Sequence, residues 1–176
     1  MAGLSVVLTV GNSLMGDDGA GPLLAELMDA EPVPGWLPVD GGSMPENIVR
    51  HVCSLKPELV LIVDATEFGL APGELRFVEQ EHIVGMRLMN THNMPLSFLM
   101  ERLREDVPKV VFLGIQPADV TFYGPLSDEV RRAVHRIHNE LAQGLTSVPW
   151  LQERAEQGQP GADRGMKYVQ NKGDIV

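Results

Sequence analysis

The chain has 176 residues, and 44% of them are hydrophobic, which is enough for one domain with a buried core of its own. Its 14 basic and 24 acidic side chains give a formal net charge of -10, a field that repels nucleic acids and anionic lipids. No apolar run approaches the roughly 20 residues of a membrane-spanning helix, and the single cysteine, Cys53, suits a reducing compartment as an inert helical thiol. We therefore expect a soluble cytoplasmic protein that binds neither nucleic acid nor membrane.

The first part of the chain predicts a strand, a loop and a helix in that order. The β-branched run at 5–10 is typical of a strand, and leucines recur at helical spacing over 23–27 after a Gly/Asp loop. A shorter strand is predicted at 36–39. It ends in "DGGSMPEN", whose glycines supply a turn and whose Pro45 fits the first turn of a second helix.

The middle of the chain predicts two strands and a helix. The segment "LVLIVDAT" at 59–66 is continuously apolar up to its aspartate, as in a central parallel strand covered on both faces. "GELRFVEQ" at 73–80 alternates weakly and predicts an edge strand. Further on, apolar residues repeat at i, i+3, i+4 and i+7 from Leu96 to Leu103, which predicts a helix.

The last elements complete an α/β domain. "KVVFLGIQP" predicts another buried strand, and "SDEVRRAVHRIHNELAQG" a long helix with Ser127 as its N-cap and Gly144 beyond its end. Strands that alternate with helices imply an α/β fold with an open, mostly parallel twisted sheet and helices on both faces. We expect this domain to span 1–146 and the polar segment 147–176 to be a flexible tail.

The glycine loop "VGNSLMGDDGAG" at 10–21 has the five-residue glycine separation of a phosphate-binding P-loop. However, Asp17 and Asp18 stand where that loop needs lysine and Ser/Thr, and an aspartate beside a phosphate adds repulsion. The glycines also read G-x-x-G-x-G, which is not the order of a dinucleotide-binding loop. Either aspartate could cap the first helix, which leaves the other one available for a cation.

A second acidic residue belongs to the same predicted edge of the sheet. Asp64 closes an apolar strand, where a carboxylate has to be solvated, hydrogen-bonded or bound to a ligand. Because ligands bind beyond the carboxyl ends of parallel strands, Asp18 and Asp64 are expected to be neighbours there. His92, in a loop before a helix, could reach the same edge. Two carboxylates and an imidazole suit a borderline divalent metal such as nickel, zinc or iron.

Two other histidines form a possible metal pair. His135 and His138 lie about one helical turn apart, but several arginines surround them in the sequence. We interpret them as part of a solvated basic helix face.

Five motifs in order resemble one family: "GNSLMGDDGAG", "DGGSMPENI", "IVDATEFGLAPGE", "THNMPLSFL" and "FLGIQP". They are similar to the maturation endopeptidases of nickel-iron hydrogenases, most closely to the type that serves the hydrogenase 3 large subunit of formate hydrogenlyase. The resemblance covers residues 5 to about 143. It implies a phosphorylase/hydrolase-like fold and a hydrolase that removes a C-terminal extension from the large-subunit precursor once nickel has been inserted.

The resemblance also implies the site. The family's metal-contacting residues fall on Asp18, Asp64 and His92, although many relatives carry glutamate at the first position. In this family the nickel is thought to be carried by the substrate precursor, so no organic cofactor and no resident metal is implied. A nickel chaperone that binds without cutting would need the same three residues, and a nucleotide-binding module would bind NAD or ATP even after Asp18→Ala.

Overall fold

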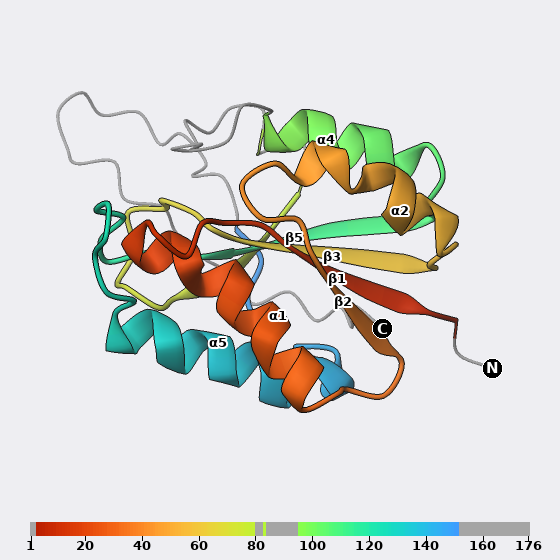
Figure 1. Ribbon diagram of the computed structural model, residues 1–176. Helices are drawn as coiled ribbons and strands as arrows, with labels where there is room; N and C mark the ends of the chain where they lie inside the picture. The colour runs from red at the N-terminus through yellow and green to blue at the C-terminus, as the bar shows by residue number, and fades with distance from the viewer. Residues whose placement is uncertain (1–2, 80–82, 84–94, 152–176) are drawn as a thin grey trace, which may run out of the picture.

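The computed structural model describes residues 3–79, 83 and 95–151, which form an open five-stranded sheet with helices on both faces (Figure 1). The strands stand in the order β2-β1-β3-β5-β4. Their bounds are β1 Ser5–Thr9, β2 Trp36–Asp40, β3 Leu59–Ala65, β4 Leu75–Val78 and β5 Lys109–Ile115. All neighbouring pairs are parallel except β4 with β5, so the expected fold class is confirmed.

Strand β3 lies at the centre of the sheet, between β1 and β5. Its residues from Leu59 to Asp64 are all buried, because helices cover both faces of the sheet. This explains why its sequence is continuously apolar instead of alternating. β4 is the edge strand that the weak alternation at 73–80 predicts, and the structure shows that it pairs antiparallel with β5.

The helices are distributed over the two faces of the sheet (Figure 1). One face is covered by α1 Ala20–Ala30 and α5 Asp128–Glu140, the other by α2 Val49–Ser54 and α4 Leu96–Arg104. Successive residues of a strand point to opposite faces, so Leu61 packs in the core layer of Leu24 while Ile62 packs in that of Leu99. The side chains of alternate strand residues therefore belong to two separate core layers, one on each face of the sheet.

Three short 3-10 helices occur in the described part of the chain: η1 Gly16–Gly19, η2 Pro45–Asn47 and η3 Leu141–Gln143. The predicted ends of the last long helix are correct. The Ser127 hydroxyl accepts a hydrogen bond from the Val130 N–H at 3.3 Å, and Gly144 adopts a left-handed φ of 75° after η3.

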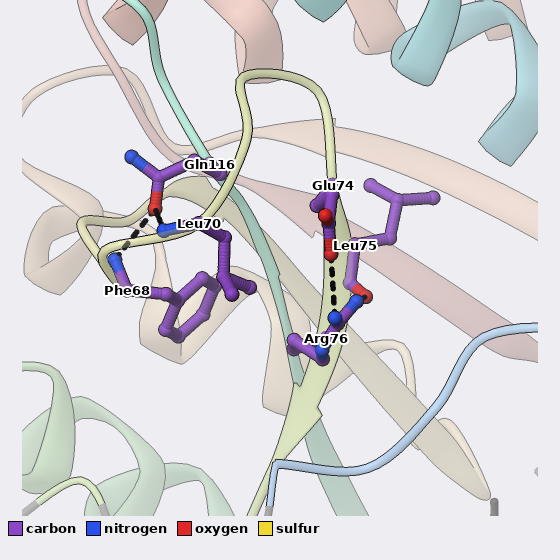
Figure 2. A network of polar contacts seen from close by, with 6 residues as sticks. All are labelled: Phe68, Leu70, Glu74, Leu75, Arg76 and Gln116. Carbon is purple, nitrogen blue, oxygen red and sulfur yellow. Dashed lines mark hydrogen bonds and ion pairs between the residues drawn. The ribbon is translucent and has the colours of Figure 1, made fainter. Parts of the chain in front are cut away.

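The free edge of β4 is protected by two devices. Arg76 folds back so that its Nη1 donates to the Leu75 carbonyl oxygen at 2.7 Å and its Nη2 pairs with Glu74 at 2.5 Å (Figure 2). The second device is the segment that follows η3, which pairs with Phe77 of β4. The Phe77 N–H donates to the Pro149 carbonyl, and the Leu151 N–H donates to the Phe77 carbonyl. These contacts occupy polar groups of the β4 edge that would otherwise be open to pairing with another chain.

The packed part of the chain extends beyond the domain boundary expected at residue 146. Val148 and Leu151 are only 4% and 3% exposed and belong to the core layers. The start of the predicted tail therefore closes the sheet edge, and its remainder, 152–176, lies outside the described residues. Within the described ranges, no helix has the length and apolar character needed to cross a membrane.

Candidate functional site

The loops that follow the parallel strands meet at one edge of the sheet, on the left in Figure 1. Beyond the end of β1, the Val10 N–H donates to the Val63 carbonyl at 2.9 Å, and the Gly11 N–H donates to the Gly42 carbonyl at 3.0 Å. Val63 directly precedes Asp64. The glycine loop is therefore attached to the residue before Asp64 and to the turn after β2.

Asp18 lies in η1, within the glycine loop, and is 4% exposed. Its Oδ2 accepts a hydrogen bond from the Asn12 N–H at 2.9 Å, so the side chain closes the loop on itself. Asp64 is 7% exposed, near the end of β3, and η1 packs against this strand. The structure therefore places both carboxylates at the carboxyl edge of the sheet, on elements that are in contact, as the sequence predicts.

Asp17 has a different role from either expected one. Its carboxylate is fully buried and accepts four hydrogen bonds, from the N–H groups of Ala118, Asp119 and Ser127 and from the Ser127 hydroxyl. Helix capping, the alternative that the sequence left open for Asp17 and Asp18, does not occur, because α1 has Gly19 as its N-cap and no side-chain cap. The 3-10 turn before α1 instead directs Asp17 to the loop that precedes α5.

The backbone N–H groups of the glycine loop donate hydrogen bonds to other groups of the protein. The N–H groups of Asn12, Met15 and Asp18 donate to groups of the same loop, and the Asp17 N–H donates to the Asp119 carbonyl at 2.9 Å. A phosphate cradle needs such N–H groups to point at the ligand. The loop geometry therefore argues against the phosphate and dinucleotide alternatives, in agreement with its two aspartates.

Two glycines permit this tight packing. A Cβ on Gly11, whose φ is 144°, would lie 2.0 Å from the Asp18 carbonyl oxygen. A Cβ on Gly21 would lie 2.2 Å from the Val10 carbonyl oxygen, where α1 crosses the end of β1. The glycines thus allow a close approach of backbone to backbone, and the acidic residue between them is held in place as a result.

Gln116 is a positioning residue that the sequence reasoning did not single out. Its Oε1 accepts hydrogen bonds from the N–H groups of Phe68 at 2.7 Å and Leu70 at 3.2 Å (Figure 2). Its Nε2 donates to Glu67 Oε2 and to the Pro117 carbonyl, both at 3.0 Å. The side chain is 3% exposed and fixes the loop that follows Asp64. The only signal in the sequence is a polar residue at the end of an apolar strand.

Of the three histidines considered in the sequence, the structure describes His135 and His138 but not His92. His92 lies outside the described residues, so its expected place beside Asp18 and Asp64 stays a prediction. His135 is exposed, as expected for a solvated face, whereas a ring nitrogen of His138 lies 2.8 Å from the Glu31 carbonyl oxygen. The described ranges contain no group of three His, Cys, Asp or Glu side chains arranged to hold a metal ion.

Comparison with known proteins decides the family. The family model of the HycI hydrogenase maturation proteases matches residues 23–143. The chain belongs to this family. A curated relative of this HycI-family chain, the hydrogenase 3 maturation protease of Escherichia coli K12, is 51% identical over 136 residues, which are 77% of this chain and 87% of the relative.

Solved structures agree with this assignment. A crystal structure of the hydrogenase 3 maturation protease matches with a TM-score of 0.76 and 49% identity, over 81% of this chain and 91% of that one. The NiFe hydrogenase maturation protease HycI of Thermococcus kodakarensis KOD1 matches with a TM-score of 0.71 and 29% identity, over 80% and 90% of the two chains. The resemblance inferred from the five motifs is confirmed, and this HycI-family chain is a hydrolase of hydrogenase maturation, an endopeptidase.

Proposed function

We propose that this maturation protease removes the C-terminal extension of a nickel-iron hydrogenase large-subunit precursor after nickel insertion, and that Asp18, Asp64 and His92 carry the reaction. The observation that supports this most strongly is the pair of buried carboxylates at one sheet edge, Asp18 at 4% and Asp64 at 7% exposure. Burial of a carboxylate is costly unless a partner or a ligand offsets it. A divalent cation brought by the substrate would interact favourably with both groups.

The three side chains recognise the nickel of the substrate and thereby position the scissile bond. A water that they orient attacks the carbonyl carbon, and the proton lost by the water goes to the amine that leaves with the C-terminal peptide. Oxygen and nitrogen ligands of this kind suit nickel, and an empty precursor offers no metal for them to contact. Selectivity for the loaded precursor then follows from a group that the empty precursor lacks.

Two isosteric substitutions test this function without removing packed volume. In Asp18→Asn, the amide oxygen still accepts the hydrogen bond from Asn12, but the negative charge is lost. Asp64→Asn changes the second carboxylate in the same way, and His92→Ala removes the predicted imidazole. The purified variants are incubated with nickel-loaded and nickel-free precursor, and the intact mass of the precursor is followed. We expect the wild type to cleave only the loaded form and the three variants to cleave neither.

Asp106→Asn is the matched control, because Asp106 is an exposed aspartate between α4 and β5. It lies at the amino ends of the parallel strands, away from the candidate site. This variant should cleave like the wild type. Cleavage at the wild-type rate by Asp18→Asn and Asp64→Asn would contradict the assigned site. Retention of an intact, nickel-loaded precursor in a stable complex with the wild type would favour the nickel chaperone instead.

A further inference from the structure

An exposed apolar cluster, formed by Leu14, Phe122 and Tyr123, adjoins the candidate site. These side chains are 48%, 58% and 74% exposed, and the two aromatic rings lie with their centroids 4.2 Å apart. They come from the glycine loop after β1 and from the loop between β5 and α5, far apart in the sequence. The Tyr123 N–H donates to the Leu14 carbonyl at 2.7 Å and joins the two loops.

The backbone at Tyr123 is held in an uncommon conformation. Its φ is 58°, in the left-handed region, where a residue with a side chain is less stable than glycine. Its ring contacts Phe122 but is 74% exposed, so burial in the core does not compensate for this conformation. Lys56 and Leu145 share this conformation, but only Tyr123 adjoins the candidate site, and outliers of this kind are enriched at active sites and ligand clamps. The fold itself would accept glycine at this position.

The same two loops are also rigidly connected beneath the cluster. Asp17 accepts hydrogen bonds from Ala118, Asp119 and Ser127, and its own N–H donates to the Asp119 carbonyl. Asp17 directly precedes Asp18 in η1. The apolar cluster and the candidate catalytic carboxylate are therefore carried by one hydrogen-bonded unit, which presents both at the same edge of the sheet.

We propose that Leu14, Phe122 and Tyr123 form the surface on which the folded hydrogenase precursor docks. This inference rests on the proposed function, because a macromolecule whose scissile bond reaches Asp18 has to lie on the loops beside it. Exposed aromatic residues on a preorganised loop are typical of the energetically dominant part of a protein interface. The precursor is the occupant of this surface, and a second copy of this chain is the competing occupant.

The test compares the double variant Phe122→Ala/Tyr123→Gly with the wild type in cleavage of nickel-loaded precursor. We expect KM to rise by about tenfold or more, as for the loss of interface hot spots, with kcat within about twofold. The midpoint of thermal unfolding should stay the same or rise, because glycine relieves the backbone at position 123. A merely structural role of these residues would lower that midpoint instead.

Leu14→Ala has a matched control in Leu37→Ala. Leu37 is a 38% exposed leucine near the start of β2, at the opposite edge of the sheet. We expect Leu14→Ala to raise KM and Leu37→Ala to leave it unchanged. An unchanged KM in the double variant, with normal cleavage by the wild type, would overturn the docking surface while leaving the proposed function intact.

If the wild type does not cleave, a binding measurement tests the docking surface separately from the proposed catalytic function. The precursor is titrated against immobilised wild type and double variant, and weaker binding to the variant supports the docking surface independently of catalysis. Equal binding overturns it. Sedimentation of the chain alone addresses the second occupant: a wild-type dimer that the double variant converts to a monomer would assign the surface to self-association and overturn the proposal.

Discussion

Asp17 and Ser127 are joined by two hydrogen bonds across 110 positions of the sequence, from the Ser127 N–H at 2.6 Å and from its hydroxyl at 2.9 Å. The same hydroxyl accepts the hydrogen bond that caps α5. One buried carboxylate thus fixes the start of α5 to the loop that contains Asp18. The positions of the glycine loop and of the last long helix are therefore coupled.

Asp17→Asn should destabilise the protein strongly although it conserves shape. The new amide group presents a donor to N–H groups that need an acceptor, and we expect the free energy of unfolding to fall by about 3 kcal/mol. Denaturation in urea measures this loss. Asp119→Asn, at an exposed position of the loop before α5, is the control: it keeps the Oδ1 that accepts from Thr121 and should cost less than about 1 kcal/mol. Equal losses in the two variants would contradict the structural role of Asp17.

Gln116→Glu tests how the loop after Asp64 is held. The substitution retains the acceptor for Phe68 and Leu70 but replaces the donor to Glu67 with a negatively charged oxygen. We expect a loss of about 2 kcal/mol of unfolding free energy at neutral pH. Protonation of the introduced carboxyl at low pH restores a donor, so the loss should narrow as the pH falls.

The control for this substitution is Gln143→Glu, since Gln143 is exposed in η3. It introduces the same charge and should change the free energy of unfolding by less than about 0.5 kcal/mol. Urea denaturation of both variants at several pH values measures the difference. A loss for Gln116→Glu that does not depend on pH would argue against the hydrogen bonds assigned to its amide group.

Gly21→Ala should lower the free energy of unfolding, although helix propensity alone predicts that alanine would raise it. Gly21 lies in the first turn of α1, where alanine is favoured over glycine by about 1 kcal/mol in a helix interior. The added Cβ would lie 2.2 Å from the Val10 carbonyl oxygen, so we expect a net loss of about 2 kcal/mol in thermal or urea unfolding. A stabilised variant would show that α1 can move away from β1 at little cost.

Gly35→Ala provides the comparison for this effect. Gly35 has a φ of 82°, and nothing lies within 4 Å of the position of an added Cβ. Its substitution should cost about 1 kcal/mol, from the left-handed backbone alone. A larger loss for Gly21→Ala than for Gly35→Ala would therefore report steric contact rather than backbone conformation.

Cys53 should react slowly with iodoacetamide. Burial raises the pKa of its thiol, and the nearby charge of Asp106 raises it further, so the folded protein disfavours the reactive thiolate. Because the pKa of this thiol is higher in the folded state, Cys53 contributes to the free energy of unfolding at lower pH. That contribution is lost as the pH rises through the folded-state pKa.

Mass spectrometry of the alkylated chain at several pH values measures the rate. We expect slow alkylation at pH 8, an increase at higher pH than for a free thiol, and faster reaction in urea, where the chain is unfolded. Asp106→Asn should raise the rate modestly, because burial is the larger cause. A rate at pH 8 equal to that of the urea-unfolded chain would contradict the inert thiol expected from the sequence.

Local information was sufficient for the main helices and strands and for the position of two carboxylates at the ligand-binding edge of the sheet, whose role in a site stays a prediction. A continuously apolar run marks a strand that is buried on both faces, and a period of 3.6 residues marks the buried face of a helix, so the predicted strand at 59–66 and the predicted helix after Ser127 are correct. A carboxylate that closes an apolar strand points to the ligand-binding edge of a parallel sheet. Asp18 and Asp64 therefore lie where the sequence predicts, whereas the place of His92 stays a prediction.

Other features depended on how distant segments come together. The order of the strands, the antiparallel edge, and the use of 147–151 to close that edge follow from packing between elements, which no local period records. The partners of Asp17 and Gln116 lie far along the chain, so their roles as structural acceptor and loop anchor arise only when the sheet has formed. Residue chemistry makes these hydrogen bonds possible, and the tertiary fold selects which of them are made, because a buried polar group binds the partner that packing brings to it.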